Sequence, residues 1–168
     1  MAANYTRRYL LAGAGLAALA LVRWPKPASA VTPENFEVQK SDEEWRKLLS
    51  KEQFDVLRKH GTEYPGSSPL NREKRKGTFA CAGCELPLFS SETKFESGTG
   101  WPSFWQPLPN AIGTTVDKAF LMTRTEVHCR RCGGHLGHVF EDGPKPTGLR
   151  YCMNGVALKF TPGEAGPA

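Results

Sequence analysis

Two identically spaced cysteine pairs constrain this chain more than any other feature of its sequence. Cys81 and Cys84 form one C-x-x-C unit, Cys129 and Cys132 form a second, and 44 residues separate the two units. Glycines lie within or directly after both units, as is typical of tight metal-binding knuckles. Two such knuckles bring four thiolates into a tetrahedron around Zn²⁺, and four thiolates leave no open position for water. We therefore predict one structural zinc ion per chain.

Two other arrangements of these cysteines remain open at this point. A local set of Cys129, Cys132, His135 and His138 would leave the first pair free as a redox pair. Ligands spaced so closely in one short segment would strain a tetrahedron, since known sites separate the two ligand pairs by about a dozen residues. Two disulfides are the other arrangement, and an oxidising compartment would permit them. Metal analysis separates the three readings, because four zinc-bound thiols are protected from alkylation.

The chain has five cysteines, so Cys152 is left without a C-x-x-C partner. A lone cysteine is often only a small buried hydrophobic residue. Arg150, however, lies two residues earlier and shares a face with Cys152 if the segment is a strand. A nearby cation lowers a thiol pKa from about 8.5 towards neutrality. Asn154, two residues later, is placed to orient a polar group, so the sequence favours a reactive thiol at Cys152.

The first 30 residues have the pattern of an export signal. Arg7 and Arg8 precede an apolar stretch of 14 residues, and Ala28-Ser29-Ala30 closes the segment. A basic start, a short apolar stretch and an A-x-A end are typical of a secretory signal peptide, and the stretch is shorter than the ~20 residues of a spanning helix. The arginine pair resembles a bacterial twin-arginine signal. We expect cleavage after Ala30 and a periplasmic protein; the alternative is an uncleaved interfacial anchor.

The net charge of +5 and the pI of about 9.0 would by themselves suggest an anionic partner. Four basic residues and no acidic ones lie in the predicted signal, which leaves 18 basic and 17 acidic residues on the mature chain. We therefore expect no nucleic-acid partner and no stable membrane insertion after processing. Residues 31–168 form one catalytic domain by this reading, and we expect it to be a monomer.

The coarse pattern predicts a mainly β domain with a helical flank at its N-terminus. Ser41 with Glu44, and Ser50 with Gln53, match two successive capping boxes, and Gly61 is expected to end the second helix. Glycine and proline together make up 30 of the 168 residues, which favours short elements joined by turns. The strands expected from composition and alternation are 78–80, 118–128, 138–140 and 155–160.

Three further segments carry a resemblance to a known family. They are 95–104 (F-E-S-G-T-G-W-P-S-F), 135–144 (H-L-G-H-V-F-E-D-G-P) and 148–154 (G-L-R-Y-C-M-N). Together with the four cysteines they closely resemble the B-type methionine sulfoxide reductases, over a core of about 43–160. The resemblance implies a tent-like fold of two small antiparallel sheets with a structural zinc. It also implies reduction of methionine R-sulfoxide in proteins or peptides.

The same resemblance implies a role for each matching residue. Cys152 would be the nucleophile that becomes a sulfenic acid, and Arg150 would help to hold it as a thiolate. His138 would be the principal proton donor, with His135 assisting. Trp101 would receive the S-methyl group, although plain core packing is its alternative. The remaining implied residues are Phe140 beside that aromatic wall, and Asn154 and Asp142 on the polar side.

One position departs from the family pattern. Many relatives have a cysteine where this chain has Thr99, and that cysteine attacks the sulfenic acid to form a disulfide. We therefore predict a one-cysteine cycle in which an external thiol, thioredoxin-like or other, reduces Cys152. Two other classes of protein stay open: a non-catalytic zinc-ribbon binding module, in which Cys152 has no role, and a thiol–disulfide oxidoreductase, which needs a metal-free C-x-x-C.

Overall fold

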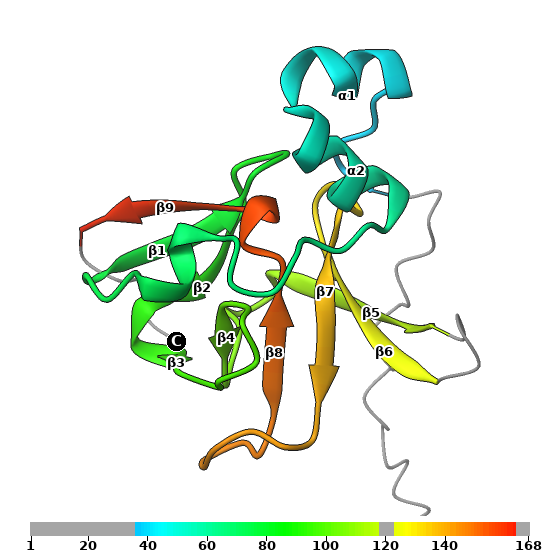
Figure 1. The fold of residues 1–168 in the computed structure, drawn as a ribbon. Helices are drawn as coiled ribbons and strands as arrows, with labels where there is room; N and C mark the ends of the chain where they lie inside the picture. Colours follow the sequence, from blue (N-terminus) through cyan, green and yellow to red (C-terminus); the bar gives the residue numbers. More distant parts are fainter. Residues whose placement is uncertain (1–35, 118–122, 164–168) are drawn as a thin grey trace, which may run out of the picture.

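The computed structural model describes residues 36–117 and 123–163, and the predicted signal peptide over residues 1–30 lies outside these ranges. Two antiparallel sheets lie side by side, and a pair of short helices covers one end of the larger sheet (Figure 1). Within the described ranges, no helix has both the length and the apolar character needed to cross a membrane. The prediction of a mainly β fold with two antiparallel sheets and a helical flank is confirmed.

The two helices begin where the capping boxes place them. Helix α1 (Asp42–Leu48) follows Ser41, whose Oγ accepts a hydrogen bond from the Glu44 amide while the Glu44 carboxylate accepts one from the Ser41 amide. Helix α2 (Lys51–Lys59) begins in the same way at Ser50 and Gln53. Both caps satisfy amides that a helix start otherwise leaves unpaired, so this part of the fold follows from local sequence.

The end of α2 differs from the expectation. The residue in the left-handed conformation is His60, with φ 55° and ψ 33°, and not Gly61. Gly61 is needed for a different reason: its amide donates to the Asp55 carbonyl, and a Cβ at Gly61 would lie only 2.9 Å from that oxygen. The glycine therefore allows a close backbone approach, while a histidine takes the unusual backbone angles.

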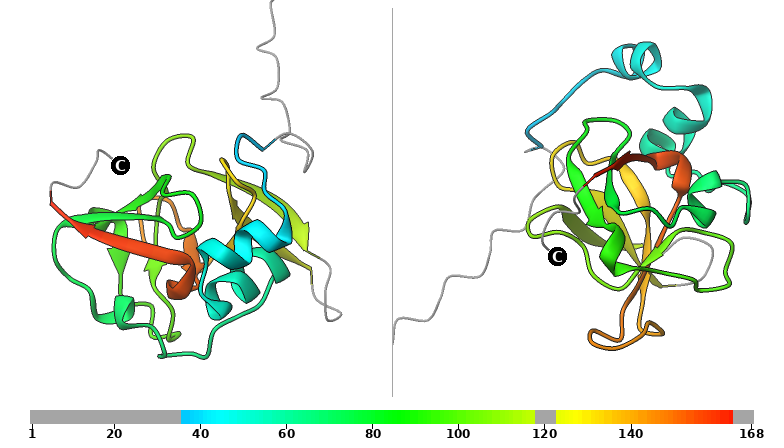
Figure 2. Two further views of the ribbon diagram at one scale, coloured as in Figure 1. Left: turned by 90° about the horizontal axis from the view of Figure 1, so that it is seen from above. Right: turned by 90° about the vertical axis from the view of Figure 1, so that its left-hand side faces the viewer.

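The smaller sheet has the order β2 (Pro87–Ser90), β1 (Gly77–Cys81), β9 (Leu158–Pro162). The larger sheet has the order β3 (Lys94–Phe95), β4 (Ser103–Phe104), β8 (Arg150–Met153), β7 (His135–Phe140), β6 (Arg124–Cys129), β5 (Ile112–Asp117). The described residues also form 3₁₀ turns: η2 (Pro69–Arg72) between α2 and β1, η3 (Ser91–Thr93) between β2 and β3, and η5 (Gly155–Ala157) between β8 and β9. Figure 2 shows the two sheets from above and from the side.

The expected strands match only in part. The segments 78–80 and 138–140 lie within β1 and β7, but 155–160 divides into the turn η5 and strand β9. Of the expected strand 118–128, residues 118–122 lie outside the described residues, and β6 begins at Arg124. Strands β2, β3, β4, β5 and β8 were not predicted. Strands β3 and β4 contain two residues each, so no alternation exists for a sequence pattern to reveal.

An aromatic core joins the two sheets. The Phe89 and Phe104 rings stack with centroids 4.4 Å apart, and Phe79 meets Phe104 edge-on at 4.9 Å. All three side chains are fully buried, and each contributes roughly 1.5–3 kcal/mol by leaving water. Phe104 belongs to β4, which pairs with β8. The buried cluster therefore fixes the strand beside the candidate site.

Candidate active site and metal centre

Strand pairing places Cys152 at the middle of the larger sheet. Its strand β8 lies between β4 and β7, and Cys152 pairs with Ser103 on one side and with His138 on the other. Gly137 precedes His138 at a point where the strands approach closely, and a Cβ there would collide with the Cys152 carbonyl oxygen. The glycine therefore permits the register that sets an imidazole directly across from the thiol.

A small cavity of about 130 Å³ opens at this thiol. Five residues singled out from the sequence meet in it, and the remaining lining comes from Thr62, Arg124 and Gly137. Those five are Cys152, His138, Trp101, Phe140 and Asn154. A larger cavity, of about 740 Å³, lies between α2 and β9, but neither a cysteine nor a histidine lines it. The smaller cavity is therefore the candidate active site, and its volume is on the scale of a single side chain.

Burial raises the pKa of the Cys152 thiol above its ordinary value, although the Thr99 hydroxyl, Arg150 and Ser103 all act to lower it. The Thr99 Oγ1 lies 3.8 Å from the Cys152 Sγ. Arg150 thus has the effect on the thiol pKa that the sequence led us to expect, but burial outweighs it. The resting thiol is protonated at neutral pH in this environment.

The pH dependence of alkylation tests this balance. We expect the iodoacetamide reaction of Cys152 to report a pKa above that of an unperturbed thiol, about 8.5. Thr99→Val should raise that pKa further, because it removes the hydroxyl that stabilises the thiolate. Thr99→Ser is the matched control and should leave it nearly unchanged. A Cys152 pKa near 7 in the unmodified protein would contradict this description of the site.

His138 is held by a carboxylate that the sequence did not single out. Its Nε2 lies 3.0 Å from the Asp117 Oδ2, and the same oxygen accepts a hydrogen bond from Arg124 Nη2 at 2.8 Å. Burial lowers the pKa of His138, and the hydrogen bond to Asp117 only partly offsets this. Asp117 ends β5 and Arg124 begins β6, so the pairing of these two strands assembles the group.

His135 lies behind His138 and does not line the cavity. The two ring centroids are 5.4 Å apart, and the His135 Nδ1 is 2.7 Å from the Glu126 Oε1. A second imidazole, that of His60, approaches the same carboxylate oxygen at 3.0 Å. Burial acts to raise the Glu126 pKa, but hydrogen bonding to His135 and the charges of the nearby histidines lower it overall. Neither Glu126 nor His60 stood out in the sequence.

Arg150 and Asp142 form a bidentate ion pair beside the cavity, with contacts of 2.8 and 2.9 Å. The Arg150 guanidinium lies 4.4 Å above the centre of the Phe140 ring. The hydrogen bonds between them lower the pKa of Asp142 and raise that of Arg150. Asp142 therefore reaches the site through Arg150, and Arg150 in turn supports the ring of Phe140 that lines the cavity.

On the side of the cavity lined by Trp101 and Asn154, Glu63 connects several segments through hydrogen bonds. Its carboxylate accepts hydrogen bonds from the Gly155 and Val156 amides at 2.6 and 3.0 Å, and its carbonyl accepts one from the Trp101 indole at 3.2 Å. The Asn154 side chain accepts from the Glu63 amide and donates to the Leu136 carbonyl. Because the contacts of Glu63 with residues 154–156 span more than ninety residues of chain, no local pattern in the sequence could have revealed them.

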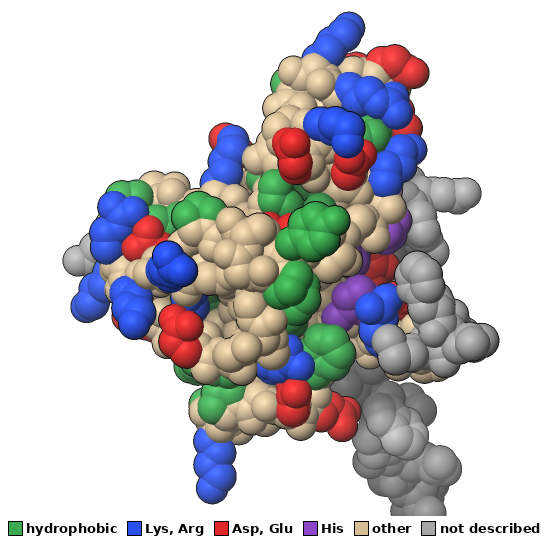
Figure 3. Space-filling model, in the orientation of Figure 1, with side chains coloured by type: hydrophobic (Ala, Val, Ile, Leu, Met, Phe, Trp, Pro, Cys, Tyr) green, Lys and Arg blue, Asp and Glu red, His purple; other side chains and the backbone are tan. Residues whose placement is uncertain are grey.

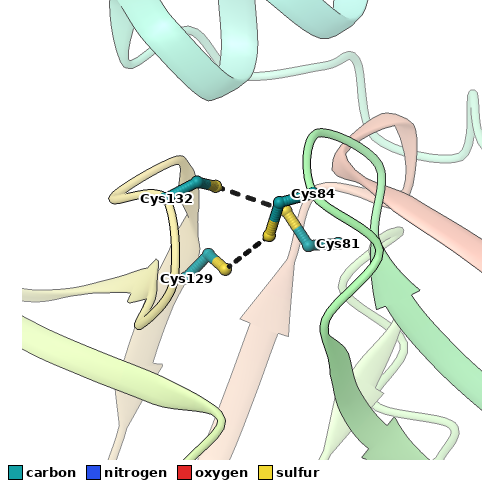
Figure 4. Close-up of side chains that lie close together, drawn as sticks. All are labelled: Cys81, Cys84, Cys129 and Cys132. Carbon is teal, nitrogen blue, oxygen red and sulfur yellow. Dashed lines mark hydrogen bonds between the residues drawn. The ribbon is translucent and has the colours of Figure 1, made fainter. Parts of the chain in front are cut away.

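The four paired cysteines meet at the end of the molecule that the helices cover (Figure 4). Cys81 and Cys132 have their sulfurs 3.8 Å apart, and those of Cys84 and Cys129 are 3.5 Å apart. A zinc–thiolate tetrahedron with bonds of about 2.3 Å has sulfur–sulfur edges of about 3.8 Å, so the four thiols fit such an ion. All five cysteines lie in the described part of the chain, and none forms a disulfide.

The local alternative with His135 and His138 does not form. Both imidazoles lie against carboxylates, Glu126 and Asp117 respectively, and the four cysteines gather without them. The knuckles join separate parts of the fold, since Cys81 ends β1 and Cys129 ends β6. Arg58 of α2 adds a hydrogen bond to the Cys132 carbonyl at 3.0 Å. A bound ion would therefore connect the two sheets beneath the helices.

Comparisons with known proteins agree with this arrangement. A family model described as the SelR domain matches residues 49–162. The peptide methionine sulfoxide reductase MsrB of Leptospira interrogans is 54% identical over 127 residues, which cover 75% of this chain and 97% of that relative. The MsrB of Methanosarcina barkeri is 55% identical over 130 residues, covering 77% of this chain and 92% of the relative.

A plant protein also matches. The chloroplastic peptide methionine sulfoxide reductase B2 of Arabidopsis thaliana is 53% identical over 127 residues, which cover 74% of this chain and 62% of that relative. Each of the three relatives matches about three quarters of this chain. This chain therefore belongs to the family of B-type peptide methionine sulfoxide reductases, the SelR-domain proteins.

Proposed function

We propose that this protein reduces the R epimer of methionine sulfoxide in peptides and proteins, with Cys152 as the nucleophile. The observation that carries the proposal is the Cys152 thiol, paired across two strands with His138 in a cavity lined by Trp101 and Phe140. The cavity offers aromatic surface for a methyl group beside polar groups for an oxygen. Membership of a family whose relatives are named peptide methionine sulfoxide reductases supports the substrate class.

The proposed step transfers one oxygen atom and two electrons. The Cys152 sulfur supplies an electron pair to the sulfoxide sulfur, the sulfur–oxygen bond of the substrate breaks, and the oxygen ends on Cys152 as a sulfenic acid. The substrate leaves as the thioether, reduced by two electrons, and Cys152 is oxidised by two. The thiol proton finishes on the sulfenic oxygen, so atoms and charge balance without a further reactant.

We assign His138 as the group that moves the proton, with His135 assisting. Charge grows on the sulfoxide oxygen as its bond to sulfur breaks, so a placed proton donor contributes most in the transition state. The lowered pKa of His138 keeps its imidazole largely neutral at pH 7, while the Cys152 thiol is protonated. A neutral imidazole across from a thiol is able to take the thiol proton and return it to the oxygen.

An epimer-resolved assay tests the function. We expect the mature protein to consume the R epimer of N-acetyl-methionine sulfoxide amide with a small-molecule dithiol as reductant, and to leave the S epimer untouched. Chromatographic separation of the two epimers before and after reaction gives the result directly. Consumption of the S epimer alone, or of neither epimer, would overturn the proposal.

We propose that an external thiol completes the cycle. Residue 99, where many relatives have a second cysteine, is here a threonine whose hydroxyl lies 3.8 Å from the Cys152 Sγ, and the other four cysteines are gathered at the metal centre. A first external thiol would displace water from the sulfenic acid to form a mixed disulfide. A second thiol would then release Cys152 and leave as an oxidised disulfide, so two external thiols are consumed for each turnover.

Oxidation by one equivalent of substrate, followed by mass spectrometry, tests this cycle. In the unmodified protein we expect one added oxygen, trapped by a sulfenic acid reagent, and no intramolecular disulfide. Thr99→Cys should instead lose the added oxygen as water and form a disulfide to Cys152, because residue 99 lies beside the thiol. An intramolecular disulfide in the unmodified protein, with its metal retained, would contradict the one-cysteine cycle.

We also propose that the ion of the four-cysteine centre is zinc. Four thiolates at tetrahedral spacing suit Zn²⁺ and leave it a structural role.

We further propose that residues 1–30 are an export signal. Export of the folded protein to a bacterial periplasm would allow the thiols to bind zinc before they meet an oxidising compartment. N-terminal sequencing of exported protein should find Val31 first; a chain that starts at Met1 would contradict cleavage.

A further inference from the structure

We propose that His60, Glu126 and His135 form a second metal site, separate from the four cysteines, for a divalent transition ion such as Zn²⁺. The binding part of this inference stands on geometry alone. Only its effect on catalysis rests on the function proposed above, because His135 is there assigned to assist His138.

The three side chains already converge on one point. The Nδ1 atoms of His60 and His135 lie 3.0 and 2.7 Å from the same Glu126 oxygen, and all three ligand atoms lie within 4.8 Å of one another. With bonds of about 2.1 Å, the 2.7 and 3.0 Å contacts correspond to angles of about 80° and 90° at the ion, so both nitrogens must move slightly away from the carboxylate oxygen to reach tetrahedral spacing. Small rotations of the side chains would therefore exchange two hydrogen bonds for three metal bonds.

The donor set is that of an open transition-metal site. Two imidazole nitrogens and one carboxylate oxygen are the protein ligands of several zinc sites that keep further positions for water. Imidazole donors favour Zn²⁺, Co²⁺, Ni²⁺ and Cu²⁺ over Mg²⁺ and Ca²⁺, which prefer oxygen ligands. The site is thus chemically unlike the closed, all-sulfur centre at the cysteines.

Two of the three ligands are buried and fixed on strands, and the third is exposed, so an ion could reach the site from solvent. The side chains of His135 and Glu126 are only 3% and 12% exposed and come from the neighbouring strands β7 and β6, whereas that of His60 is 65% exposed. Figure 3 shows histidine and acidic side chains reaching the surface next to each other below the helices. The left-handed backbone of His60 turns its ring over the buried pair, with the two imidazole centroids 5.2 Å apart.

Occupation would reach the reaction through His135. Its ring lies 5.4 Å from that of His138, which faces Cys152 across the sheet. An ion on the His135 Nδ1 would fix that ring and add positive charge behind His138. It would also join the end of α2 to the sheet. We therefore expect bound Zn²⁺ to inhibit turnover reversibly and to raise the thermal stability of the domain.

Calorimetric titration with Zn²⁺ tests the site in the full protein with its four-cysteine centre already filled. We expect one additional ion per chain, removable by EDTA under conditions that leave the first ion in place. His60→Asn should weaken this binding by about tenfold or more, since loss even of an outer-shell partner costs 10–100-fold. Asparagine tolerates the left-handed conformation, so the variant should fold and keep its basal activity.

Two further variants separate this site from its competitors. Cys152→Ser should retain the additional ion; if it loses the ion, the metal binds at the thiol and the proposal is overturned. Lys59→Asn is the matched surface control and should bind as the unmodified protein does. The imidazole resonances of His60 and His135 should shift on titration. Equal affinity in His60→Asn, or no additional ion, would also overturn the site.

Activity gives a distinct readout. Zn²⁺ should inhibit the unmodified enzyme, EDTA should restore it, and His60→Asn should need about tenfold more Zn²⁺ for the same inhibition. Binding without inhibition would refute the coupling to His135 and leave the site itself standing. Failure of the proposed reductase activity would not alter the calorimetric result, so the two failures are distinguishable.

Discussion

Replacing Cys152 by serine is expected to lower turnover of methionine sulfoxide by about four orders of magnitude or more, as is found when an enzyme loses its nucleophile. A serine hydroxyl is a far weaker nucleophile than a thiol, and its oxygen cannot be oxidised as sulfur is, so no sulfenic acid forms and the two electrons have no source. Serine is close in size to cysteine, and its hydroxyl can hydrogen-bond to the same neighbours, Thr99, Arg150 and Ser103. The fold and the metal content should therefore persist, with a stability change within roughly 1 kcal/mol.

Single-turnover reduction of the R epimer, followed in the absence of added thiol, is the measurement that isolates this step. The unmodified protein should convert one equivalent and stop, while Cys152→Ser should convert none. Thr99→Ser is the matched control, since it keeps a hydroxyl near the thiol. If Cys152→Ser converted substrate at the normal rate, the chemistry would have to come from one of the C-x-x-C pairs, as in a thiol–disulfide oxidoreductase.

Replacing Cys81 by serine should release the metal and unfold much of the domain. The Cys81 sulfur is fully buried and faces that of Cys132 across the two knuckles. A structural zinc contributes about 10–16 kcal/mol in zinc-finger peptides, comparable to the whole stability of an ordinary domain at about 5–15 kcal/mol. The expected result is loss of the cooperative thermal transition and a fall from one metal ion per chain to none.

Cys81 is the informative position because the competing ligand sets disagree about it. The four-thiolate centre loses a ligand in this variant, whereas a local set with His135 and His138 would keep all of its ligands. Elemental analysis and near-ultraviolet circular dichroism report the two properties separately. Cys152→Ser serves as the control that removes one thiol and keeps the metal. A folded, metal-loaded Cys81→Ser protein would refute the four-thiolate centre.

The features that the sequence predicted are those that depend on short spacings. The capping boxes at Ser41 and Ser50 operate over three residues, and both helices begin where they were expected. The four cysteines were identifiable because each pair is spaced for one knuckle. Arg150 and Cys152 were expected to share a face if their segment is a strand, and the structure places both on β8, although that strand itself was not predicted. In each case the pattern that carried the prediction spans no more than three residues along the chain.

The features that escaped prediction depend on contacts between distant segments. Asp117 orients His138 only because β5 pairs with β6 and β6 with β7, and Glu63 reaches residues more than ninety positions away. A lone carboxylate in a sequence is usually a solvated surface group, so neither residue stood out. Gly61 was expected to end α2 because of its residue type, whereas the C-cap residue in the left-handed conformation is His60.

The position of Cys152 on a central strand has a consequence for which oxidised methionines are repaired. Because β8 is paired on both edges, the thiol cannot swing out on a loop to meet its target. The conformational cost of the encounter therefore falls on the damaged protein, which must present one extended side chain to a cavity of about 130 Å³. Methionines in frayed termini, surface loops and transiently opened segments would be repaired first. Those in packed interiors would be repaired only after local unfolding, so the repair rate of each methionine would depend on the local stability of the substrate around it.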